Sequence, residues 1–121
     1  SSNLINIISR YTKLANKGDL GNNVYISKDN INVELFEKKS EMDVFKFLLQ
    51  LENLVNIKDW EYIQLMKLFE DNIQILIEIF DNINGVMIMT ENLNLRKNRL
   101  NLLALVRNYS LLIADFTLLN F

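Results

Sequence analysis

The chain has 121 residues, of which 50% are hydrophobic and 23% charged, and this composition is typical of one folded domain rather than a disordered segment. It contains no cysteine and no histidine, which excludes disulfides, thiolate nucleophiles, imidazole acid–base chemistry and the usual zinc sites. Its net charge of −2 argues against strong, sequence-independent attraction to nucleic acid or to an anionic membrane. The chain begins Ser1-Ser2, and we expect a single helical domain over residues 1–121 that belongs to a longer protein.

The first predicted element is a short amphipathic helix over residues 3–17. Apolar side chains recur there at steps of three or four, from Leu4 to Leu14, which is the spacing of one helix face. Gly18 follows and is expected to end the helix, because glycine tolerates the left-handed conformation found just past helix ends.

Residues 24–36 allow two interpretations. The stretches VYIS and INVELF each alternate between apolar and polar residues and are separated by the turn-like KDN, which is typical of a small β-hairpin. A lone hairpin is only marginally stable in water, so it would have to pack against the helices. The alternative is an extended loop followed by a helical turn from Val33 to Lys39.

Two further amphipathic helices are predicted in the middle of the chain. Ser40 and Asp43 resemble a capping box that opens a helix ending near Val55. A longer helix is expected over residues 58–83, with Asn84-Gly85 as its stop and turn signal.

The C-terminal segment, residues 100–121, is the predicted centre of the fold. Large apolar residues occur at nearly every angle around it, and Thr90 is a candidate N-cap for the helix that contains it. A helix that is apolar almost all round belongs inside a protein. A membrane span is not expected, since Arg107 and Asp115 interrupt the apolar run. We therefore predict a soluble, all-α or mainly α bundle of about four helices around a buried C-terminal helix, with a possible small β-hairpin at 24–36.

No residue pattern in the sequence indicates catalysis. Phosphate-binding glycine loops and nucleophile motifs are absent, and most carboxylates fall on helix faces expected to be exposed. Residues 80–91 resemble a calcium-binding loop, but Phe80 stands where the first aspartate is needed, so we interpret the segment as an Asn-Gly turn. The sequence thus predicts a protein that is not an enzyme and has no catalytic residues, cofactor or metal.

A line of asparagines and leucines along the last helix, together with Trp60, is the first candidate site. Asparagines recur there every seven residues, as Asn94, Asn101 and Asn108, so they drift slowly around one side of the helix. They are either a thin polar seam on a buried helix or a partner-binding stripe. The second interpretation predicts a non-enzymatic scaffold or adaptor domain that binds another protein or a second copy of itself. The partner-binding residues would be Asn94, Asn101, Leu105, Asn108, Leu112 and Trp60.

The alternative is a nucleic-acid-associated helical domain that uses the compact basic cluster of Arg96, Lys97, Arg99 and Arg107. This cluster is small and has no interleaved aromatics. Residues 41–84 carry an excess of acid, so we expect the cluster to pair with the third helix instead. A nucleic-acid partner is therefore not the main expectation. The predicted location is intracellular, cytoplasmic or nuclear, because no secretory signal is visible at the start.

Overall fold

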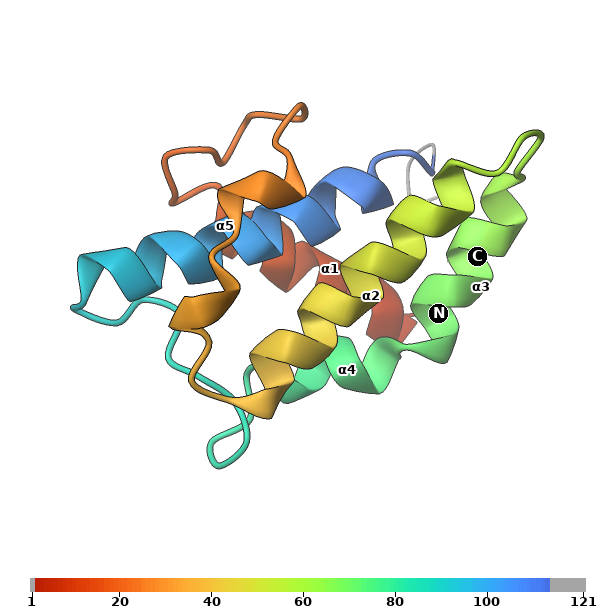
Figure 1. The fold of residues 1–121 in the computed structure, drawn as a ribbon. Coiled ribbons are helices and arrows are strands. Elements are labelled where there is room, and N and C mark those ends of the chain that lie inside the picture. The colour runs from red at the N-terminus through yellow and green to blue at the C-terminus, as the bar shows by residue number, and fades with distance from the viewer. Residues whose placement is uncertain (1, 114–121) are drawn as a thin grey trace.

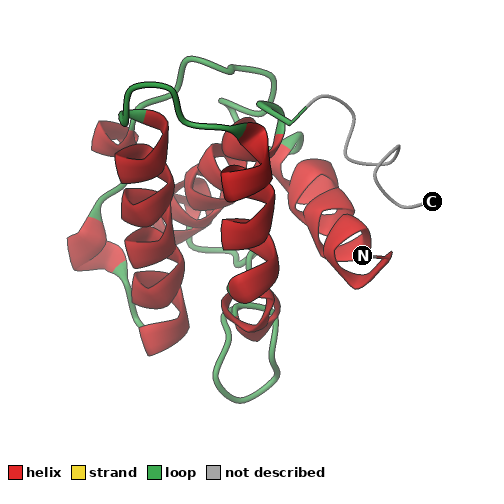
Figure 2. Ribbon diagram, turned by 90° about the vertical axis from the view of Figure 1, so that its right-hand side faces the viewer, coloured by secondary structure: helices red, strands yellow, loops and turns green. Residues whose placement is uncertain are grey.

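The computed structural model describes residues 2–113, and this part of the chain is a bundle of α-helices, as predicted (Figure 1). No strand occurs among these residues, and the helices are joined by loops of varied length (Figure 2). In chain order the elements are α1 (Ser2–Ala15), η1 (Lys28–Asn30), η2 (Val33–Leu35), α2 (Lys39–Val55), α3 (Tyr62–Asp71), α4 (Ile73–Glu78) and α5 (Leu93–Ser110), where η marks a single 3₁₀ turn.

Helix α5 is the centre of the bundle, which confirms the predicted architecture. It packs against both α1 and α2 (Figure 1). Every residue from 98 to 107 is buried. The helix ends at Ser110, and Leu111 and Leu112 just beyond it are exposed, so the buried helix stops earlier than predicted. The last predicted residues, 114–121, which include Phe116, Leu118 and Leu119, lie outside the described residues.

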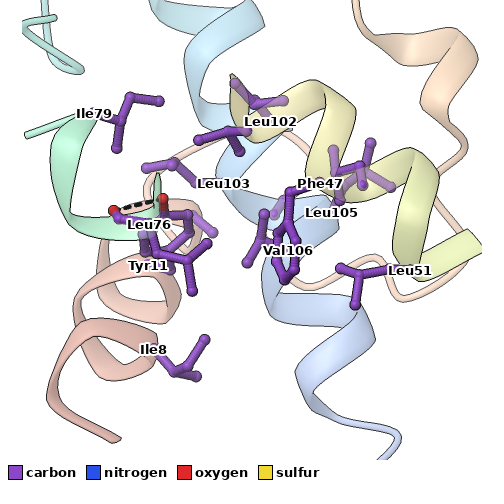
Figure 3. Packing of buried hydrophobic residues seen from close by; sticks show 14 of the residues in the cluster. Ile8, Tyr11, Phe47, Leu51, Leu76, Ile79, Leu102, Leu103, Leu105 and Val106 are labelled. Atoms are coloured by element: carbon purple, nitrogen blue, oxygen red, sulfur yellow. Dashed lines mark hydrogen bonds between the residues drawn. The ribbon is translucent and has the colours of Figure 1, made fainter. Parts of the chain in front are cut away.

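The core joins α1 to α5, and one buried hydrogen bond and one ring contact link helices across it. Tyr11 is fully buried, and its hydroxyl donates a hydrogen bond to the carbonyl of Leu76 at 2.8 Å (Figure 3). Phe47 of α2 meets Phe69 of α3 edge to face, with ring centroids 5.2 Å apart. The apolar side chains drawn around Tyr11 in Figure 3 include Ile8, Leu76, Ile79, Leu102, Leu103 and Val106.

The long helix predicted over residues 58–83 is two helices in the structure. α3 begins at Tyr62 because Asp59 adopts a left-handed backbone conformation, with φ of 62°. The break between α3 and α4 falls at Asn72, whose side-chain amide donates to the carbonyl of Leu68 at 2.8 Å. Asparagine side chains compete for backbone groups in this way, and the competition ends α3 despite the continuous apolar face.

The predicted β-hairpin at residues 24–36 is wrong, and the alternative of a loop with a helical turn is closer. The Ser27 hydroxyl accepts from the Asp29 N–H at 3.1 Å, and the Asn32 side chain accepts from the Glu34 N–H at 3.0 Å. Each bond closes a local turn rather than a strand ladder. The backbone of Asn32 also bonds to Asn98 of α5 through both its N–H and its carbonyl, so its pairing groups are already used.

Two predicted caps are also replaced by neighbouring residues. Glu41, and not Asp43, closes the start of α2, because its carboxylate accepts from the N–H groups of Glu37 and Lys38. Ser40 instead donates its hydroxyl to the carbonyl of Asn84 at 2.7 Å. At α5 the N-cap is Asn92 rather than Thr90.

In the part of the chain that the structure describes, none of the helices is both long enough and apolar enough to cross a lipid bilayer.

Candidate nucleic-acid interface

The asparagines of the predicted stripe hold a loop onto α5. The side-chain amide of Asn108 donates to the carbonyl of Asn23 at 2.9 Å, and that of Asn101 donates to the carbonyl of Asn30 at 3.3 Å. Asn101 is buried, whereas Asn94, two turns earlier, is exposed. Two of the three asparagines thus fasten the loop between α1 and α2, and the three do not form one open surface.

The two leucines of the stripe differ in how far they are exposed. Leu105 is buried, while Leu112 is half exposed. Both line a cavity of about 260 Å³ between α2, α5 and the loop that carries Lys28. The ion pair between Lys28 and Glu52, at 2.6 Å, lies in its wall.

Trp60 and Leu112 are the two stripe residues that the fold brings to one open groove. Trp60 is half-buried, and the neighbouring Tyr62 and Ile63 in this groove are exposed. No observation tests whether this groove, or the stripe as a whole, contacts a partner, so these contacts stay a prediction.

Two members of the basic cluster, Arg99 and Arg107, are buried inside the bundle. Arg99 pairs with Glu37 at 2.7 Å and with the fully buried Glu41 at 3.5 Å. Its partners therefore lie at the start of α2, not on the third helix as predicted. Arg107 donates to the side chains of Asn16 and Asn108, and burial lowers the pKa of its guanidinium.

The other two members of the cluster remain at the surface. Arg96 is half-buried and donates from Nε to the carbonyl of Thr90 at 2.8 Å. Lys97 is exposed. Neither forms an ion pair with a carboxylate among residues 2–113.

Three cations of the first helical segment, which the sequence analysis did not single out, complete this surface. Arg10, Lys13 and Lys17 are exposed and follow one another at helical steps of three and four. Gly18 packs so closely on α5 that an added Cβ would lie 3.1 Å from the Cβ of Leu100. Since Leu100 is one turn beyond Arg96 and Lys97, the end of this segment, at Lys17 and Gly18, meets α5 about one turn from these two cations. Their spacing in the sequence was the signal that could have found them.

We call this surface, formed by Arg10, Lys13, Lys17, Arg96 and Lys97, the basic face. Within the described part of the chain none of its five cations is paired with a carboxylate, whereas Lys28, Lys39 and Arg99 all are. Three exposed carboxylates reduce its charge: Asp81 lines the same hollow as Arg10, and Asp19 and Glu91 are near Lys17 and Arg96 in the sequence. The basic face is thus a modest concentration of free positive charge on an otherwise slightly acidic protein.

A hollow of about 380 Å³ opens within this face, between α1 and the loop that leads into α5. The guanidinium carbon of Arg10 lies over the ring of Phe80, 4.0 Å from its centroid. The loop is anchored where the Arg99 guanidinium donates to the carbonyl of Met87 at 2.9 Å. Gly85 is required in the same loop, because an added Cβ would lie 2.4 Å from the carbonyl oxygen of Ile79.

Comparison with known proteins identifies relatives along most of the chain. No family model matches it, and neither does any solved structure. It is similar over 111 residues, 90% of its length, to glycine–tRNA ligase beta subunits of cyanobacteria. The identity is 35% with the Gloeothece citriformis protein, 34% with that of Synechocystis and 33% with that of Acaryochloris marina. The chain spans only 15–16% of the length of these relatives.

The relatives are subunits of an enzyme. They overturn three expectations from the sequence: that the domain is a non-enzymatic scaffold or adaptor, that the protein is not an enzyme, and that nucleic acid is an unlikely partner. These expectations rested on the absence of catalytic motifs, and a domain that occupies a small part of a ligase need not contain any. The predicted intracellular location agrees with the relatives, because tRNA ligases are cytoplasmic enzymes.

Proposed function

We propose that this chain is a helical domain of a glycine–tRNA ligase beta subunit and that it contacts tRNA. The observation that carries this proposal is the similarity of 31–35% identity over 90% of the chain. The match covers almost the whole fold rather than a short motif, so a shared role for the domain is the simplest explanation. This proposal takes up the nucleic-acid alternative from the sequence and replaces the protein-docking function.

Binding, rather than bond formation, is the contribution that suits this domain. The chain has neither histidine nor cysteine, and within residues 2–113 no group of three acidic side chains is arranged to hold a metal ion. In the complete ligase the domain would position tRNA while other parts of the enzyme join it to glycine.

The basic face is the surface that we assign to the RNA backbone. Its five cations have no carboxylate partners in the described part of the chain, so binding a phosphate would not require breaking an ion pair. Phosphate contacts release condensed counterions, and affinity then falls as the salt concentration rises. Arg99 and Arg107 are excluded from this contact because their guanidinium groups are buried and bonded inside the protein.

Charge reversal on the basic face tests the proposal. Lys13→Glu with Lys17→Glu removes two exposed cations, and Lys46→Glu with Lys67→Glu is the matched control on α2 and α3. Binding of a glycine tRNA transcript is measured between about 50 and 200 mM salt, where backbone contacts dominate the affinity. The first pair should weaken binding and reduce the slope of log affinity against log salt by about 2, while the control stays near wild type.

Two results would overturn the proposal. The first is that the wild-type protein does not bind tRNA even at low salt. The other is an equal loss of affinity in both pairs of variants, which would show that net charge and not the basic face controls binding.

A further inference from the structure

We propose that the hollow between α1 and the loop from Phe80 to Met89 takes one unstacked base of the bound RNA, held against the guanidinium of Arg10. This inference rests on the proposed tRNA contact and adds a base-binding site to a surface otherwise assigned to phosphates. Single-stranded RNA is commonly recognised by bases that leave the stack and lie against aromatic rings or arginine planes.

Arg10 forms the outer layer of a platform that is fixed to the core. Its guanidinium covers the Phe80 ring at 4.0 Å, and Phe80 in turn meets the Tyr11 ring edge to face at 5.3 Å. Tyr11 is anchored by its hydrogen bond to the carbonyl of Leu76. A base stacked on Arg10 would therefore rest on a side chain whose position is already determined, which lowers the entropic cost of binding.

The walls of the hollow suit a flat, apolar group. Leu14 and Val86 are half-buried at its side, and Met87 and Met89 have 73% and 38% of their surfaces exposed. Methionine is polarizable and adapts to the shape of what it contacts, including aromatic rings. The volume, about 380 Å³, falls within the range of about 300–1,000 Å³ typical of small-ligand sites.

The charges in and around the hollow favour a base inside it and phosphates outside. Asp81 lines the hollow, and hydrogen bonds from the N–H groups of Asn84 and Ile83 to its carboxylate lower its pKa. An ionised carboxylate repels a phosphate but can accept a hydrogen bond from the amino group of a base. Lys13 on α1 and Lys17 in the turn just after it do not line the hollow, and we place the flanking phosphates near them.

Arg10→Lys separates stacking from charge, because lysine keeps the positive charge but has no planar group. The matched control is Lys13→Arg, which also keeps its charge and lies one turn along α1 from Arg10, outside the lining of the hollow. Binding of the 121-residue chain is measured to two probes: a single-stranded RNA heptamer of mixed sequence and a heptamer of the same length that carries only sugar and phosphate.

The proposal expects Arg10→Lys to weaken binding of the heptamer with bases by roughly 5- to 100-fold, the range found when one base-stacking side chain is removed. Binding of the probe without bases should not change, and Lys13→Arg should match wild type with both probes. Phe80→Leu, which removes the ring beneath Arg10, should give the same selective loss.

Two outcomes would overturn the proposal. Wild-type affinity of Arg10→Lys for both probes would show that no base stacks there. An equal loss for both probes would show that Arg10 contacts phosphate. In either case Lys13→Glu with Lys17→Glu would still weaken tRNA binding if the proposed function holds, so the two failures are distinguishable.

Discussion

Arginine side chains in this protein are either buried against internal partners or left at the surface, depending on which groups lie near them. Arg99 lies with 3% of its surface exposed beside Glu41, which is fully buried and whose carboxylate also closes the start of α2. Arg96, three residues earlier, reaches only a backbone carbonyl and stays half-buried. The same residue type therefore supplies a structural ion pair at one position and a candidate RNA contact one turn away.

Arg99→Ala should strongly destabilise the fold, because it leaves the carboxylate of Glu41 buried without its cation. Breaking one partner of a buried ion pair costs about 3–5 kcal/mol in free energy of unfolding. Lys97→Ala, on the same helix but exposed, should change stability by no more than about 0.5 kcal/mol. Denaturant unfolding of both variants checks this, and similar values for the two would show that the buried pair is not structural.

Tyr11→Phe tests the buried hydroxyl that joins α1 to α4. Loss of its hydrogen bond to Leu76 should cost about 1 kcal/mol at neutral pH. Burial raises the pKa of Tyr11 well above its ordinary value of 10.0. The buried, un-ionised phenol therefore makes its full contribution to the free energy of unfolding below pH 10.0. That contribution is lost as the pH rises through the raised pKa, since the unfolded state then ionises first. The stability difference between wild type and Tyr11→Phe, measured by denaturant unfolding, should shrink above pH 10.0. A constant difference would contradict the burial of an un-ionised phenol.

At the scale of single elements, side chains of asparagine decide where helices begin and end. Asn72 separates α3 from α4, and Asn92 accepts from the N–H groups of Asn94 and Leu95 to start α5. Asn98 fixes the loop between α1 and α2 through both backbone groups of Asn32. Asparagine side chains thus determine helix ends and loop positions in this chain, and hydrophobic periodicity does not predict these.

Asn92→Ala should therefore destabilise the protein by about 1 kcal/mol, the typical cost of losing an N-cap. Thr90→Ala, the change at the residue that the sequence favoured, should have little effect because only the carbonyl of Thr90 forms a described bond. Thermal unfolding of the two variants distinguishes these positions. A larger loss for Thr90→Ala would mean that α5 starts two residues earlier than the structure shows.

At the scale of the whole molecule, charge is distributed unevenly despite a net value of only −2. The start of α2 uses its acids to hold Arg99, and Glu52 holds Lys28. The cations of the basic face have no carboxylate partner among residues 2–113. The overall charge of the chain therefore understates how one of its surfaces can attract RNA.

In the complete ligase, Lys13→Glu with Lys17→Glu should raise KM for tRNA and leave KM for glycine unchanged. The reason is that the basic face would bind tRNA in the ground state and take no part in joining it to glycine, so kcat should also change little. Steady-state aminoacylation, with Lys46→Glu and Lys67→Glu as the control, checks this. A fall in kcat with no change in KM would place the domain in a later step than tRNA binding.

The sequence by itself determined the helical class and the identity of the central helix, because both follow from local periodicity and from the apolar run that begins at Leu100. It also predicted the approximate bounds of α1 and α2. Only the tertiary structure decided which polar residues are internal: Asn101, Arg99 and Arg107 find partners 58 to 91 residues away along the chain. The basic face likewise depends on the tertiary structure, because its cations belong to two separate segments that meet only where α1 packs beside α5. Periodicity reports which side of a helix faces inward, but it carries no information about which distant segment will meet that side.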